Sequence, residues 1–244
     1  MWIQFDAIPN ARDLGGIAVA DGRTVRPGLL LRGASLENAS DADIARLQNE
    51  FQLRHIVDLR DVGERAERPN RPVPGAEEHA FPVLPGLPSR GPMNVVPDFE
   101  GVFRRVYDRM ARSDTAVTAY ANLFRLLCSC PDGAVFFHCA QGKDRTGIAG
   151  ILILTALGAD LETAKEEYFR SNEGLRPAME NPMSVGVRPW PREILEKLFC
   201  VFPEILDVYL RALDEQWGGL DAYLRGPLGL TDADFARLRN HFLA

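Results

Sequence analysis

A cysteine and an arginine separated by five residues stand in one short segment, HCAQGKDRTG, at positions 138–147. The apolar run before it predicts a buried strand, and the apolar run after it predicts a buried helix. A loop that turns into a helix N-terminus presents backbone N–H groups, which attract an anion the size of phosphate. Arg145 adds a planar guanidinium that can hold two phosphate oxygens. The segment therefore predicts a phosphate-binding loop.

The same loop offers a nucleophile. A helix N-terminus and nearby cations favour the thiolate form of a cysteine, here Cys139. A thiolate aimed at a bound phosphorus can displace the leaving oxygen, giving a cysteinyl-phosphate that water later hydrolyses. A lone cysteine at a strand end is more often an inert core residue. The arginine, lysine and two glycines in the same segment favour the catalytic interpretation.

The residues expected to surround the phosphate lie between the nucleophile and the helix. Gly142 removes side-chain bulk where the backbone must turn, and Lys143 adds a second positive charge. Thr146 has two candidate roles, donating a hydrogen bond to the departing sulfur of Cys139 or capping the helix. We interpret His138 as a brace for the loop rather than a proton donor. The predicted phosphate-binding residues are Ala140, Gln141, Gly142, Lys143, Asp144, Arg145 and Thr146.

Hydrolysis also needs a general acid for the leaving oxygen and a base for the attacking water. Asp144 lies inside the loop, although its neighbours Lys143 and Arg145 would hold it ionised. Asp58 ends a predicted parallel strand, where α/β sheets commonly place site residues. Asp98 follows a proline-rich stretch and has a helix N-cap as its alternative role. On residue types alone, all three aspartates stay open.

The elements that must position these groups alternate between short apolar strands and helices with an apolar face. Strands are predicted at 29–31, 56–59 and 134–137, with an edge strand near 79–84. The alternation indicates an α/β fold with a mostly parallel central sheet flanked by helices. Helices are predicted from Ser40 onward and at 99–110, 114–127, 146–157, 161–170, 192–199, 204–217, 220–224 and 231–243.

One stretch breaks this alternation. Residues 69–97 hold eight of the seventeen prolines, which excludes a continuous helix or a central strand there. Long irregular segments in compact domains are often lids over a site, and otherwise they are surface connections. We expect residues 69–112 to form a movable lid or insertion. We expect residues 190–244 to add C-terminal helices to a single domain that spans residues 1–244.

Charge and hydropathy exclude several classes of protein. The chain of 244 residues has 34 acidic and 28 basic side chains, a net charge of −6, which excludes a strongly basic nucleic-acid binder. The most apolar run, 148–158, is far shorter than the roughly 20 residues needed to cross a bilayer. No secretory signal is visible at the N-terminus. We expect no nucleic-acid partner and no integral membrane association, and the oligomeric state stays open.

The cysteines indicate the compartment. Four of them, Cys128, Cys130, Cys139 and Cys200, are too few for a disulfide framework in a chain of this length. Cys128 and Cys130 also lack the second pair that a zinc site would need. We therefore expect free thiols in a reducing cytoplasm, and no metal.

The segment HCAQGKDRTG resembles the signature of cysteine-dependent protein tyrosine phosphatases. Its full form is similar to the tyrosine–serine phosphatase family found largely in bacteria and fungi. Other segments agree in order: NARDLGG at 10–16, LRGASL at 31–36, DLR at 58–60 followed by Glu64 and Pro69, and the helix end at 168–172. Ala11 departs from the usual aromatic residue, and the C-terminal helices match no motif. The resemblance covers about two-thirds of the chain, residues 10–172.

The resemblance implies a protein tyrosine phosphatase-like fold and a phosphatase that needs neither metal nor cofactor. Cys139 would be the nucleophile and Arg145 the phosphate ligand. Asp144 ranks first as general acid, because the family carries an aspartate within the signature, with Asp58 second and Asp98 third.

The implied substrate is a phosphotyrosine protein, with phosphoserine, phosphothreonine and phosphoinositides as further classes. Lys143 would help to accept extra anionic groups. Arg60 has two candidate roles, binding substrate or pairing with Glu64, and we favour the pairing. Two alternatives stay open: a phosphate-binding module without turnover, against which the intact Cys139 and Arg145 argue, and a sulfurtransferase that uses a cysteine persulfide.

Overall fold

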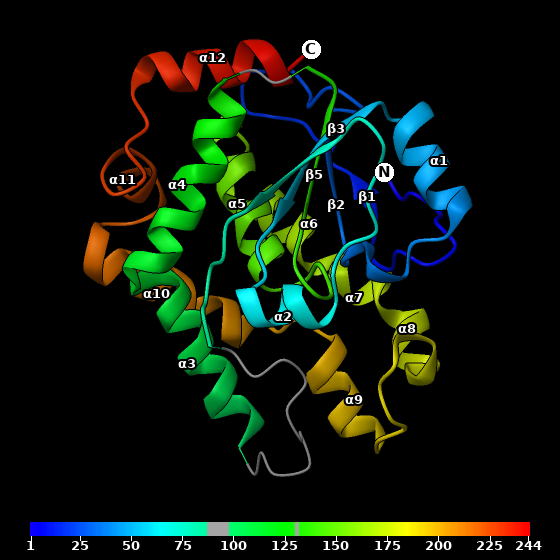
Figure 1. Cartoon of the computed structure of the whole chain (residues 1–244). Helices are drawn as coiled ribbons and strands as arrows, with labels where there is room; N and C mark the ends of the chain where they lie inside the picture. The colour runs from blue at the N-terminus through cyan, green and yellow to red at the C-terminus, as the bar shows by residue number, and fades with distance from the viewer. Residues whose placement is uncertain (87–97, 130–131) are drawn as a thin grey trace.

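A buried apolar strand lies at the centre of the fold. β5 (Ala134–His138) pairs in parallel with β2 (Leu30–Gly33) on one side and with β3 (Leu53–Asp58) on the other. β4 (Glu77–Ala80) extends the sheet in parallel beyond β3, and β1 (Arg12–Asp13) lies antiparallel to β2 at the opposite edge. The order is β1-β2-β5-β3-β4 (Figure 1). The predicted α/β fold with a mostly parallel sheet is confirmed.

The side chains of the central strand alternate between two cores, because successive residues of a strand point to opposite faces. Val135 and Phe137 join the larger core together with Val57. Phe136 joins the smaller core together with Ile56. All four apolar residues of β5 are fully buried, which is what a continuous apolar run predicts for an inner parallel strand.

Helices cover both faces of the sheet (Figure 1). The larger core is covered by α4 (Asp114–Cys128), α5 (Arg145–Leu157) and α6 (Leu161–Phe169). The smaller core is covered by α1 (Asp41–Asn49), which begins with the capping box that Ser40 forms with Asp43. A short helix that the sequence did not predict, α2 (Val62–Glu67), follows β3.

The structure is a computed structural model that describes residues 1–86, 98–129 and 132–244. The predicted edge strand near 79–84 is β4, which begins slightly earlier and does lie at an edge of the sheet. The last part of the predicted lid is α3 (Phe99–Arg112), whose Tyr107 and Met110 are buried in the larger core. Residues 87–97 of that lid lie outside the described residues, so its movement stays a prediction.

The helices predicted beyond residue 190 are present, and those from residue 203 onward share the larger core of the sheet. The helix at 192–199 instead packs with Leu175 and Ala178 in a separate small core. α10 (Pro203–Trp217) packs along α3, and α12 (Asp232–Phe242) contacts α4 and α5 (Figure 1). Among the helices in the described parts of the chain, none is both long and apolar enough to cross a membrane. The elements after α6 are α7 (Ser171–Gly174), α8 (Arg176–Glu180), α9 (Arg192–Phe199), α10 (Pro203–Trp217), α11 (Leu220–Arg225) and α12 (Asp232–Phe242).

Candidate active site

The predicted phosphate-binding loop leaves the carboxyl end of the central strand and enters α5. β5 ends at His138 and α5 begins at Arg145, so the loop joins two buried elements. Gly142 has a φ of +66°, and a Cβ placed on it would lie 2.1 Å from the carbonyl oxygen of Gly33. Only glycine fits this position, because the left-handed backbone and the close approach of β2 both exclude a side chain. The loop is therefore packed tightly against the end of β2.

Two polar side chains hold the loop carbonyls away from the site. Asn10 Nδ2 donates to the carbonyl oxygens of Gln141 and Gly142 at 3.2 and 3.0 Å, and Arg32 Nη2 donates to that of Gly142 at 2.8 Å. The C=O and N–H groups of a trans peptide unit point in opposite directions. Tying these carbonyls to Asn10 and Arg32 therefore turns the following N–H groups to the other side of the loop, where an anion can accept from them.

A buried ion cluster supports those two side chains. Glu167, on α6, accepts from Arg12 Nε at 2.6 Å and from Arg32 Nη1 at 2.5 Å. Arg12 also donates to Asn10 Oδ1. Burial would raise the pKa of Glu167, but the charges of both arginines outweigh it and lower that pKa. Burial and the neighbouring Arg32 lower the pKa of Arg12 to about 10. One carboxylate thus holds two buried cations beneath the loop.

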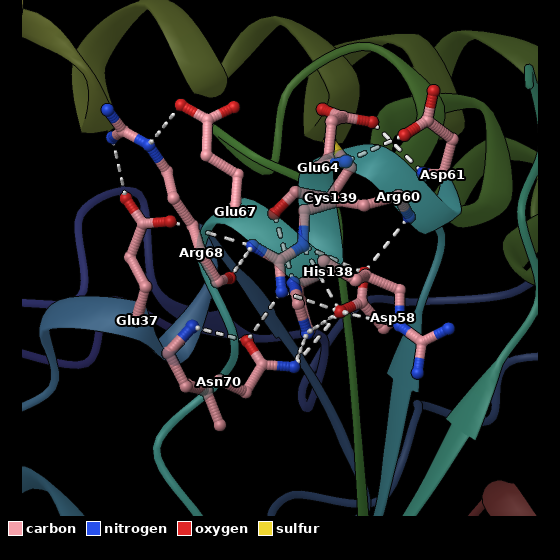
Figure 2. Close-up of polar contacts among 12 residues, drawn as sticks. Glu37, Asp58, Arg60, Asp61, Glu64, Glu67, Arg68, Asn70, His138 and Cys139 are labelled. Atoms are coloured by element: carbon pink, nitrogen blue, oxygen red, sulfur yellow. Dashed lines mark hydrogen bonds and ion pairs between the residues drawn. The ribbon is translucent and has the colours of Figure 1, made fainter. Parts of the chain in front are cut away.

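Arg145 is held by a carboxylate from α2. Its Nη1 and Nη2 donate to the two oxygens of Glu64 at 2.5 and 2.9 Å. Glu64 is the third residue of α2 and forms a capping box with Asp61 (Figure 2). Burial would lower the pKa of Arg145, but Glu64 and Cys139 outweigh it and raise that pKa, so the guanidinium stays charged. This pairing orients the guanidinium before an anion arrives.

The predicted pairing of Arg60 with Glu64 is wrong, because each of these residues has another partner. Arg60 donates from Nη2 to Asp58 at 2.7 Å and from Nη1 to the carbonyl of Arg68 at 2.8 Å (Figure 2). Glu64 is taken by Arg145 instead. The reason is the first turn of α2, which carries Glu64 toward the loop, whereas Arg60 precedes that helix and bends back to the strand end.

Asp58 is fully buried and its carboxylate is surrounded by donors. It accepts from the backbone N–H and the guanidinium of Arg60, and from Asn70 Nδ2 at 3.0 Å. Burial would raise the pKa of Asp58, but the charge of a protonated His138 and the hydrogen bonds of Arg60 outweigh it and lower that pKa. Burial also lowers the pKa of His138, so Arg60 is the partner that keeps Asp58 ionised at neutral pH.

His138 lies beneath the nucleophile. Its Nδ1 is 3.0 Å from the carbonyl oxygen of Cys139, and its Nε2 is 3.1 Å from Asn70 Nδ2 (Figure 2). A neutral ring satisfies both contacts when Nδ1–H donates to the carbonyl and Nε2 accepts from the amide. His138 therefore connects Asp58 and Asn70 to the first peptide of the loop, which is the bracing position that we expected for it.

Asp144 has a hydrogen-bond partner that its position in the sequence did not reveal. Tyr107, on α3, donates its hydroxyl to Asp144 Oδ1 at 2.6 Å, and the hydroxyls of Tyr107 and Tyr168 are 2.7 Å apart. Because Tyr107 donates to the carboxylate, Tyr168 donates to Tyr107. Burial, and then the nearby Asp144 carboxylate, raise the pKa of both phenols well above the usual range. A chain of two neutral tyrosines thus orients the carboxylate.

Lys143 is buried rather than solvated at the rim of the loop. Its Nζ lies 3.2 Å from Asp144 Oδ2 and 3.1 Å from the carbonyl oxygen of Cys200, above the ring of Phe103. Asp98, the third aspartate, caps the N-terminus of α3 by accepting from the N–H of Gly101. Asp98 therefore has the helix N-cap role that the sequence offered as the alternative to an acid role.

Thr146 has a buried hydroxyl with no hydrogen-bond partner within the described ranges of the chain. The N-cap of α5 is Asp144, and that cap also lacks a side-chain hydrogen bond. Of the two roles considered for Thr146, helix capping is therefore not the one seen. The other role, a hydrogen bond to the sulfur of Cys139, stays a prediction.

The sequence indicated some of the side chains that surround the loop and gave no sign of the others. Asn10, Arg12 and Glu64 stand in the motifs that resemble the phosphatase family, but their partners could not be named from spacing. Tyr107 and Glu167 carried no signal, since a tyrosine or a glutamate on a helix is ordinary, and only packing shows that these two are buried.

Comparison with known proteins agrees with this geometry. A model of the tyrosine phosphatase family matches residues 3–244. A protein of Cupriavidus necator, whose name is that of a tyrosine-protein phosphatase, is 36% identical over 256 residues, covering 99% of this chain and 88% of its own. The triple specificity protein phosphatase PtpB of Mycobacterium tuberculosis is 27% identical, covering 96% of both chains. With its parallel sheet, its central cysteine loop and these matches over its length, the chain belongs to the tyrosine phosphatase family of enzymes.

Proposed function

We propose that this phosphatase works through a covalent intermediate on Cys139. The thiolate attacks phosphorus, the S–P bond forms, and the bond to the leaving oxygen breaks. That oxygen takes a proton and departs as the alcohol. Water then attacks phosphorus, the S–P bond breaks, and inorganic phosphate leaves. The observation that carries this proposal is the loop itself, whose carbonyls are tied to Asn10 and Arg32 while Arg145 is held in place beside Cys139.

Arg145 and the loop N–H groups would stabilise the charge on the transferring phosphoryl group. When Cys139 leaves phosphorus in the second step, its sulfur regains a negative charge. The buried hydroxyl of Thr146 is in the right segment to donate a hydrogen bond to it. The sulfur must be reduced to act, which agrees with the reducing cytoplasm expected from the sequence.

We assign the general acid to Asp144 and a positioning role to Asp58. Asp144 keeps part of its side chain accessible, 22% against 0% for Asp58. The carboxylate of Asp58 is filled by hydrogen bonds from Arg60 and Asn70, which leaves it no path to a leaving oxygen. Proton transfer requires direct reach, so the greater accessibility of its side chain supports Asp144 as the general acid.

Asp144→Asn tests this assignment. We expect kcat for phosphoserine to fall by about 10²–10⁴, because the serine alkoxide needs a proton to leave. The loss should be far smaller with p-nitrophenyl phosphate, whose leaving group is stable as an anion. Asp58→Asn should lower stability and reduce both activities alike. A leaving-group-dependent loss in Asp58→Asn, without one in Asp144→Asn, would reverse the assignment.

Tyr107→Phe removes the hydrogen bond to Asp144 and leaves the ring in the core. A hydrogen bond to a charged group is worth about 1.5–3 kcal/mol, so we expect kcat to fall roughly tenfold, with KM little changed. The loss should be larger with phosphoserine than with p-nitrophenyl phosphate, because only the serine alkoxide needs the proton that Asp144 would supply. Tyr168→Phe is the control, because Tyr168 contacts Tyr107 rather than Asp144, and its kcat should fall less. An equal loss with both substrates in Tyr107→Phe would show that Tyr107 has only a packing role.

We propose phosphotyrosine as the main substrate class. One relative is named a triple specificity phosphatase, which is the reason to test phosphoserine, phosphothreonine and phosphoinositides as well. A cavity of 160 Å³ lies beside the loop and offers room for part of a substrate. Its lining includes Ala140, Gln141, Ser35, Glu37, Leu175 and Phe199.

A substrate panel tests the proposal. Purified protein with a metal chelator should release inorganic phosphate from a phosphotyrosine peptide over many turnovers, and faster than from the phosphoserine, phosphothreonine and phosphoinositide substrates. Steady turnover would exclude a pure binding module. Turnover of thiosulfate without any release of phosphate would favour a sulfurtransferase and overturn the proposal.

A further inference from the structure

Two histidines and a glutamate meet on one face of the sheet edge. In the parallel pair of β3 and β4, His55 stands opposite Glu77, and His79 follows Glu77 by two residues. Residues two apart in a strand point to the same face, so all three side chains lie on one face of the β3–β4 pair. β4 is the edge strand of the sheet, and nothing in the proposed reaction uses these residues.

The three side chains lie within reach of a single ion. Their candidate ligand atoms all lie within 4.8 Å of one another. His55 Nδ1 is 3.0 Å from His79 Nε2, and these are the two nitrogens that would share the ion. Two imidazole nitrogens that bind the same tetrahedral Zn²⁺ are about 3.3 Å apart, because each Zn–N bond is about 2.0–2.1 Å. A shift of a few tenths of an ångström would open the histidine pair enough for the ion.

The surroundings favour a cation. The Glu77 carboxylate places a negative charge within 4.8 Å of a ligand nitrogen of each histidine. The rings of His79 and Phe81 are stacked, with centroids 5.9 Å apart, which limits how the His79 ring can turn. His79 is 17% exposed and Glu77 is 72% exposed. The histidines are thus held by packing, while the carboxylate can move to complete the coordination.

We propose that His55, Glu77 and His79 form a binding site for a divalent transition metal ion of the Zn²⁺ type. Imidazole nitrogen together with one carboxylate oxygen suits Zn²⁺ better than Mg²⁺ or Ca²⁺, which prefer oxygen ligands alone. Water would fill the remaining coordination position. The sequence indicated no metal because its cysteines lack the spacing of a zinc site, whereas these three ligands come together only when β4 pairs with β3.

Such a site would join the edge strand to the sheet. β4 leads directly into residues that hydrogen-bond to the end of β3, where Phe81 N–H donates to the carbonyl of Asp58. A ligand that binds only the folded state stabilises it in proportion to its concentration over Kd. The bound ion should therefore raise the resistance of the chain to unfolding, without touching the phosphate-binding loop.

The experiment measures Zn²⁺ binding by titration calorimetry and thermal unfolding with and without Zn²⁺. It uses the full chain with Cys139→Ser, which removes the thiol of the phosphate-binding loop as a competing zinc ligand. We expect one equivalent of Zn²⁺ to bind and to raise Tm. His79→Gln in the same background should bind at least tenfold more weakly and lose most of the increase in Tm. His241→Gln, a partly exposed histidine elsewhere, is the matched control and should bind as the parent does.

Each outcome decides the proposal. Equal Zn²⁺ affinity in the parent and in folded His79→Gln would overturn it, as would the absence of saturable binding in the parent. If His79→Gln unfolds even in chelator, Glu77→Gln replaces it, since that side chain is exposed and its removal spares the core. Unchanged affinity in Glu77→Gln would then remove the carboxylate from the site and overturn the three-ligand proposal.

Discussion

Cys139→Ser should lose at least roughly 10³-fold in turnover of an aryl phosphate, because a serine hydroxyl is a far weaker nucleophile than a thiolate at neutral pH. The variant should still bind inorganic phosphate. Arg145 and the loop N–H groups supply that affinity, and the substitution leaves them in place. Steady-state kinetics measures the first effect and titration calorimetry with phosphate measures the second.

Cys200→Ser is the matched control for this experiment. Cys200 is half-buried and contacts Lys143 through its backbone carbonyl, which serine retains. We expect its turnover to stay within about twofold of the wild type. Undiminished hydrolysis by Cys139→Ser would refute the covalent mechanism. Loss of phosphate binding together with turnover would instead mean that the thiol helps to shape the loop.

Glu167→Gln should be the most destabilising single substitution around the site. The variant leaves Arg12 and Arg32 buried without the carboxylate that both contact. Removing one partner of a buried ion cluster costs about 3–5 kcal/mol, a large part of the 5–15 kcal/mol by which domains are usually stable. Urea unfolding measures the free-energy difference. Glu166→Gln, its exposed neighbour on α6, is the control and should change stability by less than about 0.5 kcal/mol.

At acid pH, the free energies of unfolding of wild type and Glu167→Gln should differ by less. The ordinary pKa of a glutamate is 4.5, and that of Glu167 is lower in the folded state. A lowered folded-state pKa adds stability that is fully present above about pH 4.5 and is lost as pH falls through the folded value. Wild type and Glu167→Gln should therefore differ by a constant amount between pH 7 and about pH 5, and by less below that. A difference that stays constant under acid would show that Glu167 contributes shape rather than charge.

The activity of Glu167→Gln connects the cluster to the loop. Arg32 also donates to the carbonyl of Gly142, so releasing Arg32 should loosen the loop. We expect kcat to fall even in solution conditions where the variant remains folded. Wild-type kcat in the folded variant would mean that Asn10 holds the loop without help.

Much of the fold followed from local pattern. The strand at 134–137 and the helix behind it were evident because a parallel strand buried on both faces must be apolar throughout. Ser40 and Thr231 marked helix starts because their side chains satisfy backbone N–H groups within the same few residues. The helix α2 was missed, since it is short and has no buried residue to create an apolar period.

The sequence by itself determined the chemistry. Cys139, Asp144 and Arg145 lie in one loop of a few residues, and chain connectivity alone keeps them together. The tertiary structure decided which groups serve them. Glu64 holds Arg145, Tyr107 orients Asp144, and Glu167 supports the loop from below, each across tens of residues of chain.

Burial determines which of these polar and charged side chains become partners. A charged or polar group removed from water must find its opposite nearby, and which opposite lies nearby depends on how strands and helices pack. Arg60 shows the difference: its sequence neighbour Glu64 was a reasonable partner, but the first turn of α2 carried Glu64 to Arg145 and left Asp58 for Arg60. Spacing along the chain predicts a catalytic loop, and only packing specifies the side chains that surround that loop.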